Sequence, residues 1–161
     1  MKTEYPNRKR NRLKEFNYAS ANSYYITVCT ANRAKIFWIN DITSTLSPIG
    51  IVAEEEILSL GRRFQLAIID HYVIMPDHIH LIITLYDPQS GTDAKTPNVK
   101  NLIGSLKASI TKRLGNGSIW QKSFYDHVIR NDKDYEDIWN YISMNPIRYL
   151  DRMLLQTKPK P

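Results

Sequence analysis

The stretch Tyr72–Ile83 places two histidines one residue apart at the head of an apolar, β-branched run. Successive side chains of a strand point to opposite faces, so His78 and His80 would share one face. The odd positions from Ile79 to Leu85 would form an apolar face that has to be buried. Two adjacent imidazoles suit a divalent metal, and two polar residues satisfied by backbone groups are the alternative. The pattern predicts the strand and leaves the use of the histidines open.

The composition predicts one folded domain over residues 1–161. This length is enough to bury a core, and apolar residues make up 42% of the chain, which excludes a disordered protein. The single Cys29 cannot form an intramolecular disulfide, which fits a reducing cytoplasm. No apolar run approaches the roughly 18 residues of a membrane span, and the signal-peptide pattern is absent. We expect a cytoplasmic protein without a membrane partner and a disordered tail at about residues 157–161.

Positive charge is concentrated at the start of the chain. The formal net charge of +6 favours a polyanionic partner. We expect a basic arm over residues 1–15 to contact nucleic-acid phosphates, and a solvated arm without a specific role is the alternative. The basic residues of this arm are Lys2, Arg8, Lys9, Arg10, Arg12 and Lys14.

The patterning predicts seven elements in the order strand, helix, strand, strand, helix, strand, helix. Ser47-Pro48 is a helix start signal, and Pro76-Asp77 is a tight connection within a hairpin. Pro146 favours an end of the last helix near Asn145. The order predicts an α+β ferredoxin-like sandwich, an antiparallel sheet of about four strands with helices packed on it. The predicted ranges are strand 24–30, helix 48–63, strand 66–75, a strand from residue 78, helix 98–114, strand 125–130 and helix 131–145.

The helix expected at 98–114 is amphipathic and basic, with cations off its apolar stripe. We expect Lys107, Lys112 and Arg113 of this helix to bind DNA phosphates together with the arm. His127, in the last strand, is a lone histidine. Such a residue is usually a hydrogen-bonded structural group, and a place at the edge of a site is the alternative.

The last helix offers a tyrosine as a nucleophile, because Cys29 is expected to be buried and no serine lies in a nucleophile elbow. At 100° per residue, Tyr135 falls in an apolar arc with Ile138, Trp139 and Ile142 and is expected in the core. Tyr141 falls outside this arc, and Asn145 follows it by one turn. A phenol and an amide on one side of a helix could present a nucleophile and an oxygen ligand. A half-buried tyrosine with a hydrated hydroxyl is the alternative.

The string Met-Pro-Asp-His-Ile-His-Leu, within Tyr72 to Leu81, resembles the hallmark of the IS200-like single-tyrosine transposases. These are HUH endonucleases, in which U is a hydrophobic residue. The likeness extends over most of the chain and begins with Tyr25-Ile26-Thr27, Asn32-Arg33 and Ile36-Phe37. A later set of residues is similar to the REP-associated tyrosine transposase branch. This set is Trp120-Gln121, Phe124 to His127, Ile129-Arg130, Tyr141-Ile142 and Asn145-Pro146.

The resemblance implies roles for particular residues. His78 and His80 would hold a divalent metal, Mg²⁺ or Mn²⁺, and Tyr141 would attack DNA. Asn145 stands where mobile members carry a glutamine and would be a further metal ligand. Asp77 stands where many members have asparagine and would lie at the edge of the site.

The implied activity is that of a metal-dependent single-stranded DNA endonuclease and strand transferase acting on hairpin-containing DNA through a 5′-phosphotyrosine intermediate. The partners would be single-stranded or hairpin DNA, and the protein would be nucleoid-associated. Family members include monomers and swapped dimers, which leaves a homodimer open. The alternatives are an inactive, domesticated DNA-binding protein and a metal-dependent phosphodiester hydrolase that uses water. The hydrolase would need a second histidine motif that the sequence lacks.

Overall fold

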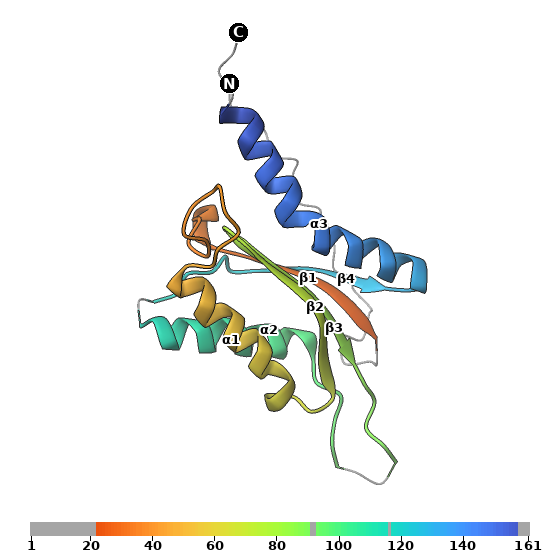
Figure 1. The fold of residues 1–161 in the computed structure, drawn as a ribbon. Coiled ribbons are helices and arrows are strands. Elements are labelled where there is room, and N and C mark those ends of the chain that lie inside the picture. Colours follow the sequence, from red (N-terminus) through yellow and green to blue (C-terminus); the bar gives the residue numbers. More distant parts are fainter. Residues whose placement is uncertain (1–21, 91–92, 116, 158–161) are drawn as a thin grey trace.

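The strands form one antiparallel sheet in the order β2-β3-β1-β4. The computed structural model describes residues 22–90, 93–115 and 117–157. Helices α1 and α2 cover one face of the sheet and α3 lies on the other (Figure 1). The elements are β1 (Ser23–Cys29), η1 (Ala31–Arg33), α1 (Pro48–Arg63), β2 (Ala67–Met75), β3 (His78–Leu85), α2 (Val99–Leu114), β4 (Tyr125–Ile129) and α3 (Asp132–Thr157).

This architecture confirms the predicted α+β sandwich with a four-stranded antiparallel sheet. The boundaries of the strands and of the first two helices agree with the prediction to within about a residue. The basic arm at residues 1–15 lies outside the described residues. So does the expected tail, apart from Thr157, which ends α3.

The main core lies between the sheet and the helices α1 and α2. The odd positions of β3, Ile79, Leu81 and Ile83, are fully buried there, as the alternation predicted. The apolar residues of α1 and α2 occupy the other side of this core. The burial fixes which side of β3 faces away from the core, and this side carries the histidines.

Local signals start α1, and start and end α2, where the sequence predicted. The Ser47 side chain accepts a hydrogen bond from the Gly50 backbone N–H at 3.1 Å, and Pro48 begins α1. The Asn98 side chain caps α2, which ends at Gly115 in the left-handed conformation. Gly50 also allows close approach, because a Cβ there would lie 2.2 Å from the Phe37 carbonyl oxygen.

The predicted end of the last helix at Asn145 is wrong, because α3 continues through Pro146 to Thr157. A proline inside a helix removes one backbone hydrogen bond and favours a bend. Beyond Pro146, however, Tyr149 and Leu150 pack against the main core. This tertiary contact outweighs the local signal. In Figure 1 the first half of α3 lies along the sheet and the second half rises away from it.

We expect Gly50→Ala to lower the free energy of unfolding by about 1–3 kcal/mol, because the added Cβ has no room beside the Phe37 carbonyl. Gly104→Ala in α2 is the matched control, since a Cβ there would meet no atom within 4 Å. This substitution should be stabilising by up to about 1 kcal/mol. Urea unfolding measures both values, and equal effects would contradict the close approach.

Candidate functional site

The α3 face of the sheet carries the polar side chains that the sequence singled out. In β3 the histidines lie on this face, and Thr27 of β1 pairs directly with His80. Along the opposite edge of β1, Tyr125 of β4 pairs with the same Thr27. A small apolar cluster of Ile82, Ile129 and Ile142 holds α3 on the same face. The sheet register and this cluster therefore bring four elements together around the two histidines.

The two histidines face one another through their Nε2 atoms, which are 3.1 Å apart. Their ring centroids are 4.6 Å apart. The Nδ1 atom of His78 lies 2.6 Å from an Asp77 carboxylate oxygen. The Nδ1 atom of His80 lies 2.9 Å from both the Tyr25 and the Thr27 hydroxyl oxygens. With the proton on Nδ1, each ring donates to these oxygens, and both Nε2 lone pairs face one point.

Burial determines the charge of His80. His80 is 4% exposed. Burial, together with the charges of Arg33 and of His78 when it is protonated, lowers its pKa to about 3, although the Asp77 charge acts in the opposite direction. For Asp77, burial by itself would raise the pKa, but the hydrogen bond with His78 and the charges of His78 and Arg33 outweigh burial and lower it. At neutral pH, His80 is therefore neutral and the Asp77 carboxylate, on the far side of His78, is ionised.

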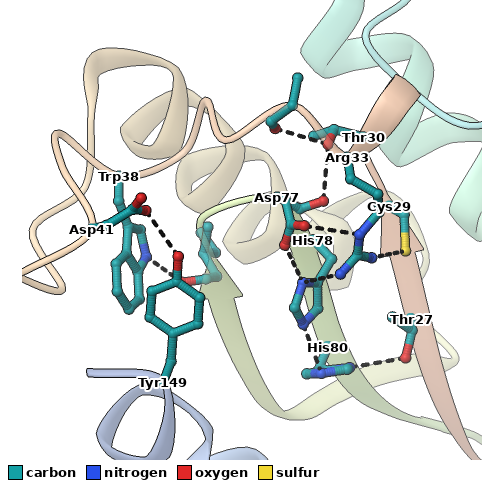
Figure 2. A network of polar contacts seen from close by, with 12 residues as sticks. Thr27, Cys29, Thr30, Arg33, Trp38, Asp41, Asp77, His78, His80 and Tyr149 are labelled. Atoms are coloured by element: carbon teal, nitrogen blue, oxygen red, sulfur yellow. Dashed lines mark hydrogen bonds and ion pairs between the residues drawn. The ribbon is translucent and has the colours of Figure 1, made fainter. Parts of the chain in front are cut away.

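Asp77 and Arg33 hold the turn before β3, as Figure 2 shows. Arg33 Nε lies 2.8 Å from the second Asp77 carboxylate oxygen, and Arg33 Nη1 donates to the Cys29 sulfur at 2.8 Å. Thr30 binds the Asp77 carbonyl through its backbone N–H and its hydroxyl, each at 3.0 Å. Asp77 therefore lies directly behind His78, which places it at the edge of the site.

Arg33, like Tyr25 and Thr27, has a role in this site that the sequence did not indicate. Arg33 and the preceding Asn32 both have left-handed backbone angles, with φ of 56° and 54°. Such angles are unfavourable for an arginine, and the ion pair with Asp77 offsets the cost. The only sequence signal was the Asn-Arg pair after the first strand, because asparagine favours such a turn.

Tyr141 of α3 reaches this site. Its ring centroid lies 5.5 Å from that of His80 and 6.3 Å from that of Tyr25, both edge-on. Its side chain is 43% exposed. The neighbouring Ile142 is fully buried in the small apolar cluster. The helix thus sets Tyr141 at the border between the sheet and solvent, as its position outside the apolar arc predicted.

Tyr135 and Trp139, two other residues of the predicted apolar arc, differ in how far they are buried. Tyr135 is half-buried against the small apolar cluster, so it packs with the core without being enclosed by it. Trp139 was expected inside the arc, but it is 37% exposed and stacks on His71 with centroids 4.1 Å apart. The prediction for Trp139 was wrong because α3 lies towards the edge strand β2, where one side of the arc meets solvent.

Asn145 is half-buried on α3, one turn after Tyr141. In the described ranges, no group of three or more His, Cys, Asp or Glu side chains is arranged to hold a metal. A metal on the histidines would therefore take its remaining ligands from other donors, such as an amide, water or a phosphate. Asn145 as a metal ligand stays a prediction.

His127 does not join the histidine pair. Its Nε2 lies 2.8 Å from the Asp134 carboxylate in the first turn of α3. In the sheet it pairs with Tyr25. It connects β4 to the start of α3, which is the hydrogen-bonded structural role expected for a lone histidine.

Helix α2, which carries Lys107, Lys112 and Arg113, lies on the other face of the sheet from α3 (Figure 1). Arg113 forms ion pairs with Glu55 and Glu56 of α1. Lys107 is half-buried and donates to the Gln121 carbonyl at 2.6 Å. Lys112 is exposed. The structure thus separates these cations from the histidine pair. Their contact with DNA stays a prediction, as does that of Arg8, Lys9, Arg10, Arg12 and Lys14, which lie outside the described residues.

Known proteins resemble this chain in sequence and in fold. No family model matches the sequence. An uncharacterized protein of Haemophilus influenzae is 30% identical over 87% of this chain and 88% of its own length. A REP-associated tyrosine transposase of Escherichia coli is 35% identical over 50% of this chain, which spans 45% of that relative. The solved structure of a REP-associated tyrosine transposase bound to a REP hairpin superposes with a TM-score of 0.64 and 25% identity, covering 83% of this chain and 72% of that one.

The chain belongs to the REP-associated tyrosine transposases. The family prediction and the prediction of a transposase enzyme are therefore confirmed. A structure from Deinococcus radiodurans R1, 15% identical with a TM-score of 0.52, shares the fold. Within the described part of this transposase, none of the helices has the length and apolar character needed to span a membrane.

We expect the free energy of unfolding of the metal-free transposase to fall by up to about 1.4 kcal/mol per pH unit as the pH drops from about 6.5 towards 3. Because the pKa of His80 is lowered to about 3 in the folded protein, the unfolded chain takes up the proton first. Urea unfolding with a chelator at several pH values measures this slope. His80→Gln does not titrate and should show a shallower slope. Equal slopes would contradict a buried neutral His80.

Proposed function

We propose that this transposase cuts and rejoins single-stranded DNA at hairpin-containing sites, with Tyr141 as the nucleophile and a divalent metal at His78 and His80. One observation carries the proposal. The Tyr141 ring lies against His80 of the same chain, where the two histidine Nε2 atoms face each other at 3.1 Å. The match to a relative solved with a REP hairpin supports hairpin DNA as the partner.

The donor set fits a divalent ion. Neighbouring ligands of an octahedral ion with bonds of about 2.1 Å lie about 3.0 Å apart, close to the separation of the two Nε2 atoms. Each Nδ1 has an oxygen partner, which orients the ring as the hydrogen-bond partners of metal-bound histidines do in known sites. Two imidazoles completed by oxygen ligands would accept Mg²⁺ or Mn²⁺, and we propose the Asn145 amide oxygen as a further ligand. When bound, the metal would neutralise charge on the non-bridging phosphate oxygens.

Tyr141 would supply the attacking atom. Its phenol would lose its proton, the oxygen would bond to phosphorus, and the bond from phosphorus to the 3′ oxygen would break. The products would be a 5′-phosphotyrosine and a 3′-hydroxyl, which takes up a proton. The reverse attack by a 3′-hydroxyl would rejoin a strand without ATP, because the phosphotyrosine keeps the phosphodiester bond energy.

Exposed aromatic side chains next to the site would stack unpaired bases. Tyr125 is 40% exposed, and its ring centroid lies 6.0 Å from that of Tyr25. Stacking needs unpaired bases, which supports a single-stranded substrate. We propose that the basic arm at residues 1–15 adds phosphate contacts.

We expect Tyr141→Phe to reduce cleavage by at least about 10³-fold and to abolish the covalent adduct, since it removes only the attacking oxygen. Tyr135→Phe, on the same helix, is the matched control and should cleave normally. Denaturing electrophoresis of protein incubated with labelled hairpin DNA and Mg²⁺ or Mn²⁺ detects the adduct, and peptide mapping locates it. An adduct that persists in Tyr141→Phe, or maps to Tyr125 or Tyr135, would overturn the assignment. Cleavage without an adduct under rapid quench would indicate a hydrolase that uses water.

We expect His78→Ala and His80→Ala to abolish metal-dependent cleavage while the affinity for DNA changes by less than about threefold, because binding depends on phosphates and stacking. Cleavage against metal concentration and a gel-shift titration measure the two quantities. His127→Ala is the control, since His127 is bonded to Asp134 away from the pair. Unchanged cleavage by both single variants would remove the metal site from the proposal. DNA binding by the wild type without cleavage would indicate a domesticated DNA-binding protein.

A further inference from the structure

The second half of α3 is fixed by a compact group of side chains around Tyr149. The Tyr149 hydroxyl donates to an Asp41 carboxylate oxygen at 2.8 Å. Its ring meets Trp38 edge-on, with centroids 5.4 Å apart, and Lys35 Nζ lies 5.7 Å from the ring centroid. Lys35 also bonds the other Asp41 oxygen at 2.7 Å. We call these four residues, Lys35, Trp38, Asp41 and Tyr149, the Tyr149 cluster. Figure 2 shows Trp38, Asp41 and Tyr149 of this cluster.

The segment that receives Tyr149 is bonded to the end of β2 and the turn before β3. The backbone N–H groups of Ile36 and Phe37 both donate to the Pro76 carbonyl, at 2.9 and 3.0 Å. The Trp38 indole N–H donates to the Ile74 carbonyl at 2.7 Å. His78 follows Pro76 by only two positions. The Tyr149 cluster therefore connects α3 to the turn that presents the histidines.

Tyr149 and Ile142 anchor α3 at two points on the C-terminal side of Tyr141. Ile142, the next residue, is buried in the small apolar cluster. Tyr149 follows Tyr141 by eight positions, about 12 Å along a helix axis. Between the anchors, Pro146 removes a helical hydrogen bond and makes this point the easiest place for α3 to bend. Without the second anchor, the helix that carries Tyr141 would be tied to the sheet only through its first half.

The polar character of the anchor is specific. The hydrogen bond from Lys35 holds the pKa of Asp41 below its usual range, so that Asp41 stays an ionised acceptor at neutral pH. A charge-assisted bond from a phenol to a carboxylate is more directional than apolar packing. It can set the rotation of α3 about its axis, which packing of Leu150 alone would leave less defined.

We propose that the Tyr149 cluster is a positioning device that holds Tyr141 in register with the histidine pair of its own chain. The inference depends on the proposed role of Tyr141 and adds the residues that place it. Tyr149 does not contact the reacting atoms. Loss of its hydroxyl should lower the rate of strand cleavage and leave DNA affinity unchanged, because a displacement of about 1 Å can cost about 10²-fold in rate.

The test compares Tyr149→Phe with Tyr135→Phe, two substitutions that each remove one hydroxyl from the same helix. The Tyr135 hydroxyl interacts with Asp70, away from the Tyr149 cluster. Single-turnover adduct formation is measured with saturating labelled hairpin DNA and Mn²⁺, well below the thermal midpoint of each variant. We expect Tyr149→Phe to react at least about tenfold more slowly with a dissociation constant within about twofold of wild type. Tyr135→Phe should behave as wild type in both.

Variants of the acceptor distinguish positioning from general destabilisation. Asp41→Ala removes the acceptor and should match Tyr149→Phe, whereas Asp41→Asn keeps an oxygen acceptor and should recover much of the rate. The double variant Tyr149→Phe/Asp41→Ala should be no slower than either single one, because both remove one interaction. Wild-type rates in Tyr149→Phe, equal losses in Tyr135→Phe, or additive losses in the double variant would each overturn the proposal.

Hydrogen exchange, which does not depend on DNA cleavage, separates this inference from the proposed function. If the wild type formed no adduct, the role of Tyr141 would fail, and the connection through the cluster would still be measured by hydrogen exchange. Tyr149→Phe should then increase exchange in α3 after Pro146 and in the turn at Pro76-Asp77, and Tyr135→Phe should change neither. Unchanged exchange in Tyr149→Phe would overturn the connection.

Discussion

The pairing of β1 with β3, locked by the buried odd positions of β3, is the constraint on which the site depends. A slip of one residue would move His80 into the apolar core and Ile79 to the α3 face, and the burial of Leu81 and Ile83 would be lost with it. Burial of several such side chains contributes far more than any single polar contact of the site. The free energy of the core therefore fixes the presentation of the histidines.

Orientation within that register comes from polar partners on other elements. Thr27 and Tyr25 reach His80 from β1, and Asp77 reaches His78 from the preceding turn. The Asp77 carboxylate favours the proton on Nδ1 of His78, and the two hydroxyl oxygens can accept a proton on Nδ1 of His80; in these tautomers both Nε2 lone pairs face one point. Burial keeps His80 neutral, which a metal ligand requires. A rigid strand thus carries the two histidines, while a helix on the same face carries the tyrosine.

Much of the fold could be predicted from the sequence because its signals are local. The alternation in β3, the start of α1 at Ser47-Pro48 and the end of α2 at Gly115 each depend on residues close in the chain. The border position of Tyr141 followed from helical geometry. The helix beyond Pro146 could not be predicted, because the local signal favoured an end and the opposing contacts of Tyr149 come from residues more than a hundred positions away.

Strand and helix periods were enough to predict the class of fold, the shared face of His78 and His80, and a tyrosine at the edge of an amphipathic helix. Three relations could be seen only in the folded protein: Tyr141 lies against His80 of its own chain, α2 and its cations occupy the far face, and Arg33 supports Asp77. These relations depend on how the elements pack and on side chains that meet across the sheet. No local pattern in the sequence encodes such distances.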